Sequence, residues 1–391
     1  MTNQASELVR ELISYSGLSR GRVLTIGGEE DFASAPLRAD FEIFSVDLDN
    51  LATVDLAEFD LCLYWASRGN ANDLQHTLRA VRRALPVNGA LMLIVSATAP
   101  STDAIQGLLI QADFTDLIVA SHGATIRTFL VRPKQKRAAP LLSVLVPVYN
   151  ERTTFPVMMG HLLEKTIEGL DIEVVVIESN STDGTRTEVL KYAGHPGVHT
   201  LFQDKPYGKG HALRAGLEIA NGDLILFQDA DLEYDIDDYD ALIEPLMRFE
   251  TQFVLGARRN AGDCPWNIRR FQNSKSVATY LNIGHALFLA LFNFVYKQSL
   301  TDPFTMFKVF RRECIYGLRL ESNRFDIDNE LVIKLLRKGY KPMEVPVNYV
   351  ARSYQEGKKI TPFGDALRWL RALIKFKNAP LYADCNGSGA K

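Results

Sequence analysis

Cysteine is scarce in this sequence. Its 391 residues include four cysteines, which lie far apart with no C-x-x-C spacing: Cys62, Cys264, Cys314 and Cys385. This spacing gives no reason to expect a disulfide framework or a zinc site, and it fits a reducing compartment. A strong excess of charge is also lacking, since the formal net charge is -3, so nothing favours nucleic acid as a partner. The length predicts two domains of ordinary size.

No segment reads as a signal peptide or as an uninterrupted membrane span. Acidic residues interrupt the N-terminal stretch 1–17, which predicts an amphipathic helix. Residues 277–295 are apolar over nearly the length of a span, but they include Asn282, His285 and Asn293, and such polar groups are costly in lipid. We therefore expect a buried or interfacial helix there. The expected location is the cytoplasm, either free or peripheral on the inner face of the membrane, and a homo-oligomer is left open.

The order of apolar and polar segments predicts an α/β protein with two Rossmann-like units. In residues 1–135, apolar strand-like runs alternate with helical patterns, which is typical of a parallel sheet covered on both faces. Residues 136–140 belong to a basic, proline-bounded linker, and 141–350 repeat the alternation. Residues 351–391 add a basic loop and a helix with interleaved cations and apolar residues. That helix either lies on anionic lipid or packs against the core.

The stretch ILFQDADLEY (225–234) puts two carboxylates at the end of an apolar strand. Asp229 and Asp231 are two positions apart, and residues at this spacing share one face of a strand. Two hard oxygen ligands suit Mg2+ or Mn2+ together with the phosphates of a nucleoside diphosphate. The alternative is a solvated acidic turn, because further acidic residues follow.

Six motifs follow one another between residues 140 and 375. They are VPVYNE (146–151), VVVIESNSTDGT (174–185), KPYGKGHALRAGLEIANGD (205–223), QDADLEYDIDDY (228–239), TDPFTMFKVFRREC (301–314) and VNYVARSYQEGKKI (347–360). This ordered set resembles the family 2 glycosyltransferases of GT-A fold, and within them the polyprenyl-phosphate (dolichyl-phosphate) mannose and glucose synthases. The resemblance implies metal-dependent, inverting transfer of a hexose from a nucleoside diphosphate sugar to a polyprenyl phosphate.

The resemblance also implies a donor site. A base and ribose would meet the ends of the first two strands of the second unit, and the metal and diphosphate would meet Asp229 and Asp231. The second motif departs from the usual Asp-Asp-Gly-Ser of the family, which leaves open a uridine or guanosine donor. The expected donor-binding residues are Pro147, Tyr149, Asn150, Glu151, Glu178, Asn180, Asp183, Lys209, Asp229, Ala230, Arg352 and Lys358.

Cations flank the expected diphosphate. Lys209 stands between two glycines just before a helix, where the backbone allows close approach and the helix N-terminus favours an anion. We expect it to act in catalysis. Arg352 and Lys358 lie in a polar loop, which is either a solvated face or, as the resemblance implies, a phosphate-binding loop.

The acceptor decides whether a base is needed. A hydroxyl acceptor benefits from a carboxylate that removes its proton, whereas a phosphate oxygen is already ionised. Asp326, Asp328 and Glu330 begin a predicted helix, where capping accounts for one carboxylate but not easily for three. A base therefore remains possible, and the resemblance to related glycosyltransferases implies Asp328, by its position, as the expected base of the alternative function, transfer to a glycan hydroxyl. A non-catalytic protein that binds a sugar nucleotide or S-adenosylmethionine is the other alternative.

In the first unit, a glycine turn with Gly27 and Gly28 follows the first strand, and Asp47 follows the second, as binding of a nucleoside cofactor requires. This opening resembles that of S-adenosylmethionine-dependent methyltransferases. The third glycine is replaced within the acidic stretch 29–31. We therefore expect a degenerate, non-catalytic scaffold, with S-adenosylmethionine binding as the alternative.

Overall fold

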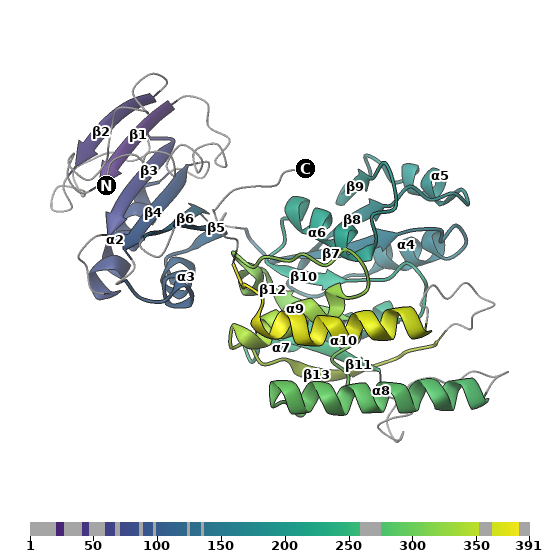
Figure 1. Ribbon diagram of the computed structural model, residues 1–391. Coiled ribbons are helices and arrows are strands. Elements are labelled where there is room, and N and C mark those ends of the chain that lie inside the picture. The colour runs from purple at the N-terminus through teal and green to yellow at the C-terminus, as the bar shows by residue number, and fades with distance from the viewer. Residues whose placement is uncertain are drawn as a thin grey trace. The chain divides into compact units, whose positions relative to one another are not determined.

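The computed structural model describes residues 21–26, 41–46, 59–66, 71–85, 89–96, 99–122, 126–133, 137–258, 275–351 and 362–382. They form two compact units, each built on its own sheet (Figure 1). The predicted α/β class with two Rossmann-like units is confirmed. The N-terminal stretch 1–17 lies outside the described residues.

The first unit has a mostly parallel sheet of strand order β2-β1-β3-β4-β6-β5, in which β6 runs antiparallel to β4 and β5. Apolar runs such as the third strand are buried on both faces, as predicted. Gly27, Gly28 and Asp47 lie outside the described residues, so the methyltransferase resemblance stays a prediction. The elements are β1 (Gly21–Ile26), β2 (Phe41–Val46), β3 (Leu61–Ala66), α2 (Ala71–Ala84), β4 (Ala90–Ser96), α3 (Thr102–Gln111), β5 (Phe114–His122) and β6 (Ile126–Pro133).

Two later segments also belong to the first unit, namely Tyr316–Arg319 and the chain from Pro380. Tyr316 and Tyr382 pack against the core of the first unit, and the amide of Gly317 donates to the carbonyl of Leu117 at 3.1 Å. The predicted boundaries keep these segments outside the first unit. The difference arises because a short apolar segment carries no local signal of which core it covers.

The second unit has a seven-stranded sheet of order β13-β11-β12-β10-β7-β8-β9. Strand β12 runs antiparallel to β10 and β11, and the other pairs are parallel. The elements are β7 (Leu141–Val148), α4 (Phe155–Glu164), β8 (Asp171–Glu178), α5 (Thr185–Leu190), β9 (Val198–Phe202), α6 (Lys209–Ile219), β10 (Leu224–Phe227), η3 (Ile236–Asp238), α7 (Tyr239–Met247), β11 (Phe253–Arg258), α8 (Lys275–Tyr296), β12 (Lys308–Arg311), η4 (Arg312–Ile315), α9 (Ile327–Arg337), β13 (Met343–Val347) and α10 (Pro362–Asn378).

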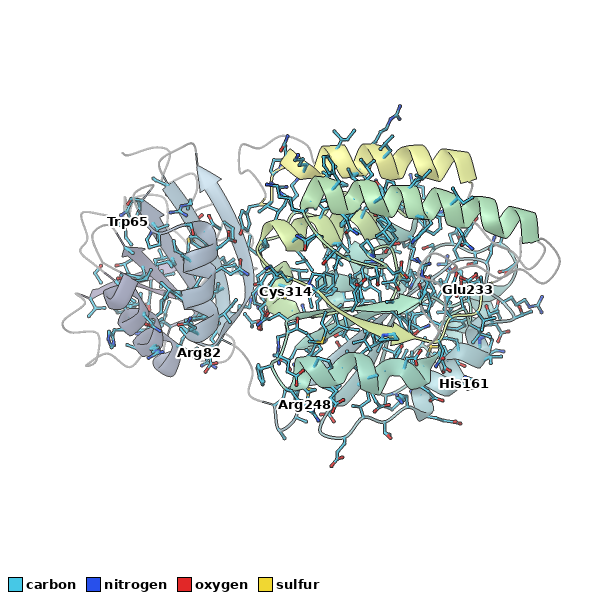
Figure 2. All side chains as sticks on the ribbon, turned by 90° about the horizontal axis from the view of Figure 1, so that it is seen from below. Trp65, Arg82, His161, Glu233, Arg248 and Cys314 are labelled. Atoms are coloured by element: carbon cyan, nitrogen blue, oxygen red, sulfur yellow. The ribbon has the colours of Figure 1, made fainter. Side chains whose placement is uncertain are left out.

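Helices α8 and α10 lie side by side in the second unit (Figures 1 and 2). The hydroxyl of Tyr296, at the end of α8, donates to the carbonyl of Leu373 at 2.5 Å. Helix α8 contains the apolar stretch 277–295. Within the described part of the chain, no helix is both long enough and apolar enough to cross a membrane.

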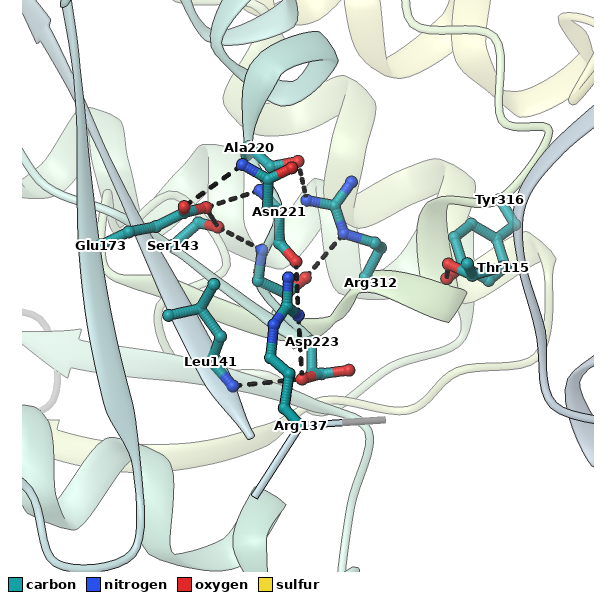
Figure 3. A network of polar contacts seen from close by, with 11 residues as sticks. Thr115, Arg137, Leu141, Ser143, Glu173, Ala220, Asn221, Asp223, Arg312 and Tyr316 are labelled. Carbon is teal, nitrogen blue, oxygen red and sulfur yellow. Dashed lines mark hydrogen bonds and ion pairs between the residues drawn. The ribbon is translucent and has the colours of Figure 1, made fainter. Parts of the chain in front are cut away.

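A buried polar network holds together the beginnings of β7, β8 and β10 (Figure 3). Glu173 accepts from the Ser143 hydroxyl and from the Asn221 amide, both at 2.5 Å, and Ser143 accepts from the amide of Gly222 at 2.7 Å. Arg312 donates to the carbonyl of Gly222 at 2.6 Å. The network fixes the strand ends opposite to those that carry the candidate site.

Candidate active site

The candidate site lies at the carboxyl ends of β7, β8 and β10. The chain runs from β7 outward through β8 and β9, and then returns to the other side of β7 to form β10. Such a reversal of strand order leaves a crevice in which ligands of open α/β sheets bind. Asn150, Ser179 and Asp229 follow these three strands at that edge.

An ion pair occupies the end of β10. The ammonium of Lys209, the first residue of α6, lies 2.7 Å from Asp229 Oδ1. Asp231 Oδ1 accepts from the backbone amide of Glu233 at 3.1 Å, which orders the turn. Burial alone would lower the pKa of Lys209, but Asp229, Asp328 and Asp231 raise it above its usual value. The structure therefore brings together the predicted cation and three predicted carboxylates.

The packing of the folded chain requires the two glycines beside Lys209. Gly208 has a φ of 107°, and a Cβ there would collide with the carbonyl of Asn323. A Cβ on Gly210 would collide with the carbonyl of Ser322. The amide of His211 also donates to Asn323 O at 3.2 Å. The segment before α9 thus packs on the first turn of α6. This contact links the helix of Asp328, α9, to the helix of Lys209, α6.

Asp328 is held by a buried lysine that the sequence analysis missed. Lys308 lies in β12, is fully buried, and donates to Asp328 Oδ1 at 3.2 Å and to the carbonyl of Thr305. Burial lowers the pKa of Lys308, and Asp328 partly offsets this effect. The available signal was a single lysine inside the apolar run FKVF.

The other two carboxylates at the start of α9 have structural contacts. Glu330 is fully buried and accepts from the amides of Glu321 and Ser322 and from Lys334, the last at 2.6 Å. Asp326 accepts from the amide of Arg324 at 3.2 Å. Asp328 is therefore the carboxylate of this group that lies with Lys209.

Hydrogen bonds tie the end of β7 to the turn after β8. Asn150 has a φ of 51°; its amide donates to Ser181 Oγ at 2.9 Å, and its side-chain oxygen accepts from the amide of Thr182 at 2.8 Å. The amide of Glu151 donates to Thr185 Oγ1 at 2.8 Å. These contacts fix the strand end at which Pro147 and Tyr149 stand.

Two of the carboxylates predicted to bind the donor shape this turn. Glu178 is fully buried and accepts from the amides of Asn180 at 3.2 Å and Ser181 at 2.6 Å. Asp183 accepts from the amides of Thr185 and Arg152 at 2.9 and 3.2 Å. Its partial burial would raise its pKa, but a hydrogen bond from the Thr185 hydroxyl at 2.5 Å, together with these two amides, holds the pKa below its usual value. Contact of Glu178, Asn180 or Asp183 with the donor stays a prediction.

With this geometry in view, comparison with known proteins gives the family. Residues 143–318 match the model of the family described as "Glycosyl transferase family 2". This segment is a family 2 glycosyltransferase domain. It contains Asn150, Lys209, Asp229 and Asp231, and Asp328 follows it.

The glycosyltransferase domain also resembles curated proteins. A dolichyl-phosphate beta-glucosyltransferase of Trichomonas vaginalis is 31% identical over 229 residues, which cover 54% of this chain and 66% of the relative. A dolichol-phosphate mannosyltransferase of Pyrococcus furiosus is 26% identical over 239 residues, which cover 60% of this chain and 64% of the relative. The chain thus spans just under two thirds of the length of these relatives.

Solved structures resemble the chain less closely. The glucosyl-3-phosphoglycerate synthase of Mycobacterium tuberculosis, solved with Mn2+, uridine-diphosphate-glucose and phosphoglyceric acid, has 20% sequence identity and a TM-score of 0.45. The match covers 62% of this chain and 81% of that protein.

Arg352 and Lys358 of the glycosyltransferase's predicted basic loop lie outside the described residues.

Proposed function

We propose that the glycosyltransferase domain transfers a hexose from a nucleoside diphosphate sugar to a polyprenyl phosphate, with inversion at the anomeric carbon. The observation that carries the proposal is the Lys209–Asp229 ion pair, with Asp231 and Asp328 close enough to raise the pKa of Lys209. The names of the relatives, a dolichyl-phosphate glucosyltransferase and a dolichol-phosphate mannosyltransferase, support a lipid phosphate as acceptor.

Asp229 and Asp231 suit a divalent cation that arrives with the donor. Among the residues the structure describes, no group of three or more His, Cys, Asp or Glu side chains could hold a metal ion. Mg2+ commonly binds through one or two carboxylates and completes its coordination with substrate phosphates and water. The aspartate pair is therefore sufficient for Mg2+ or Mn2+ when a diphosphate is present. The cation, when bound, neutralises charge on the leaving diphosphate.

The protein's own residues supply fixed charge and positioning. Lys209 stays protonated at neutral pH, because the nearby carboxylates more than offset the lowering of its pKa by burial, and it stabilises negative charge on the leaving diphosphate. Arg352 and Lys358 are proposed as further phosphate ligands. An oxygen of the acceptor phosphate forms the new bond to the anomeric carbon as the bond to the diphosphate breaks. That oxygen is already ionised, so no side chain has to remove a proton.

A second candidate is transfer to a glycan hydroxyl with Asp328 as the base. The contact between Asp328 and Lys308, next to Lys209, favours it. Asp328→Asn separates the two functions. A phosphate acceptor is expected to keep its rate within about threefold, whereas a hydroxyl acceptor should lose about 10²- to 10⁴-fold.

The measurement is transfer of labelled hexose from UDP- and GDP-sugars to a polyprenyl phosphate and to an oligosaccharide panel. Asp326→Asn is the matched control, because Asp326 directly precedes the same helix and its side chain accepts from the amide of Arg324 in the adjoining turn. Transfer by the wild-type protein to oligosaccharides and to no lipid phosphate would contradict the proposed acceptor.

A lipid acceptor requires contact with the membrane surface, and α8 and α10 suit it. Ile283, Leu287 and Phe294 of α8 are 47%, 69% and 83% exposed, and α8 carries no charged residue from 282 to 296. The neighbouring α10 exposes Ile374 together with cations such as Lys377. An apolar face beside basic residues is typical of a helix pair that lies on anionic lipid.

Replacing Leu287 and Phe294 together by glutamine should weaken binding to phosphatidylglycerol vesicles about tenfold or more, because two exposed apolar side chains no longer enter the lipid. Vesicle co-sedimentation measures this, and nucleotide binding should not change. Val157→Gln with Leu190→Gln is the matched control, since these side chains are also exposed but belong to α4 and α5. Equal loss in both double variants would argue against a specific lipid-binding face.

A further inference from the structure

The turn that presents Asp231 has a strained backbone. Leu232 has a φ of 61°, in the left-handed region that residues other than glycine rarely adopt. Its side chain is not buried, since Leu232 is 39% exposed, so burial of the leucine does not explain this conformation. The Asp231 carboxylate accepts from the amide of Glu233 at 3.1 Å and closes the turn. A strained backbone of this kind persists only where surrounding contacts hold it.

The segment that follows β13 supplies such contacts. Tyr234 and Tyr349 form an isolated antiparallel bridge, and the amide of Val350 donates to the carbonyl of Glu233 at 2.9 Å. The hydroxyl of Tyr349 donates to Glu233 Oε2 at 2.6 Å. Burial raises the pKa of Tyr349, so this hydroxyl keeps the proton that it donates. Both the backbone and the side chain of Glu233 are therefore tied to the segment 349–350.

The ring of Tyr349 is itself fixed by buried groups. It lies 5.1 Å from the ring of Tyr234 and over the guanidinium of Arg258 at 5.2 Å. Arg258 is paired with the buried Asp302, and the Tyr234 hydroxyl accepts from the amide of Met306 at 2.9 Å. The Tyr349 hydroxyl therefore meets Glu233 from a platform of buried, mutually bonded groups.

Building on the proposed function, we propose that Tyr349 is a positioning residue of the metal site, which acts through Glu233 on Asp231. By holding Glu233, Tyr349 fixes the backbone amide that orients the Asp231 carboxylate. Replacing a group that orients a metal ligand typically weakens metal binding about 10- to 100-fold. Glu233 serves in this arrangement as the acceptor of the Tyr349 hydroxyl, and not as a third carboxylate ligand of the cation.

The test measures how tightly the protein holds Mn2+ beside a nucleoside diphosphate, without any acceptor. Isothermal titration calorimetry of UDP and of GDP is carried out over a series of Mn2+ concentrations and with EDTA. The Mn2+ concentration that gives half of the gain in nucleotide affinity should rise about tenfold or more in Tyr349→Phe. The nucleotide affinity in EDTA should stay within about threefold of the wild-type value, because the hydroxyl acts on the metal site alone.

A conservative change of Glu233 separates positioning from metal ligation. In Glu233→Gln the amide oxygen can still accept from Tyr349, so the Mn2+ requirement should stay within about threefold of that of the wild-type protein. Glu233→Ala removes the acceptor and should raise the Mn2+ requirement as Tyr349→Phe does. Combining Glu233→Ala with Tyr349→Phe should add little, because both remove the same hydrogen bond.

Tyr296→Phe is the matched control for the loss of a tyrosine hydroxyl. It removes the hydrogen bond to the carbonyl of Leu373 at 2.5 Å, which joins α8 to α10. It should keep the wild-type Mn2+ requirement. Should Tyr349→Phe fail to fold, the contrast between Glu233→Gln and Glu233→Ala decides by itself.

The outcomes distinguish this inference from the proposed function. An unchanged Mn2+ requirement in Tyr349→Phe would overturn the positioning role and leave the glycosyltransferase proposal standing. An equal rise in Glu233→Gln and Glu233→Ala would also overturn it, since Glu233 would then be a ligand of the metal. So would an equal rise in Tyr296→Phe and Tyr349→Phe. Failure of UDP and GDP to gain any affinity from Mn2+ in the wild-type protein would overturn both proposals.

Discussion

Replacing Asp229 and Asp231 together by asparagine is expected to lower kcat/KM for hexose transfer about 10³-fold or more, since a metal ion contributes several kcal/mol of charge stabilisation to the transition state. Asparagine keeps the size of each side chain but removes the charge that pairs with Lys209 at Asp229 and the charge that the proposed metal ion would need. Stabilisation of the protein by UDP or GDP with Mn2+ should disappear as well. Thermal shift with Mn2+ and with EDTA measures the second effect independently of the acceptor.

The matched control is Asp237→Asn. Asp237 belongs to the same acidic segment, but it is exposed and lies in the short helix η3. It should keep both activity and metal-dependent nucleotide binding. If EDTA leaves the wild-type activity unchanged while the double variant is inactive, the two aspartates act without a metal, and the proposed metal site is wrong.

Asp302→Asn is expected to lower the free energy of unfolding of the glycosyltransferase domain by about 3–5 kcal/mol, because it leaves a buried cation without its partner. Asp302 is fully buried and accepts from Arg258 Nε at 2.7 Å and from the second guanidinium nitrogen at 2.8 Å. Tyr349 lies over the same guanidinium at 5.2 Å. Urea denaturation followed by tryptophan fluorescence and circular dichroism measures the change.

The Arg258–Asp302 pair also predicts that the free energy of unfolding depends on pH. Burial alone would raise the pKa of Asp302, but Arg258 lowers it to about 2, below the value of about 3.9 in an unfolded chain. The stabilisation of the folded state by ionised Asp302 is therefore fully present above about pH 4 and is lost as the pH falls towards 2. Asp302→Asn should remove this part of the acid transition.

Asp240→Asn provides the comparison. Asp240 pairs with Lys165 but its side chain is 58% exposed, and such surface pairs contribute about 1 kcal/mol or less. Equal destabilisation by Asp240→Asn and Asp302→Asn would show that burial of the Arg258 pair has no special energetic consequence.

Much of the second unit could be predicted from the sequence because its signals are local. Apolar strands that end in polar residues placed Asn150 and Asp229 at one edge of a parallel sheet. The helix that was expected to follow Lys209 begins at Lys209 itself, and Gly208 and Gly210 allow the close approach of residues 322–324.

Contacts between distant segments could not be predicted in this way. Lys308 and Asp328 are 20 residues apart, and Ser179 and Gln203 are 24 apart. A lysine in an apolar strand and a serine in a turn give no sign of their partners. The roles of Glu330 and Glu178 in holding backbone amides were hidden for the same reason.

The sequence by itself determined the α/β class, the two units and the ordered motifs of a family 2 glycosyltransferase, because periodicity and strand-end chemistry are encoded over a few neighbouring residues. Only the tertiary structure decided which carboxylates stand with Lys209 and which accept backbone amides instead. These properties depend on burial and on partners supplied by other strands and helices. Those partners come together only when the whole sheet is packed.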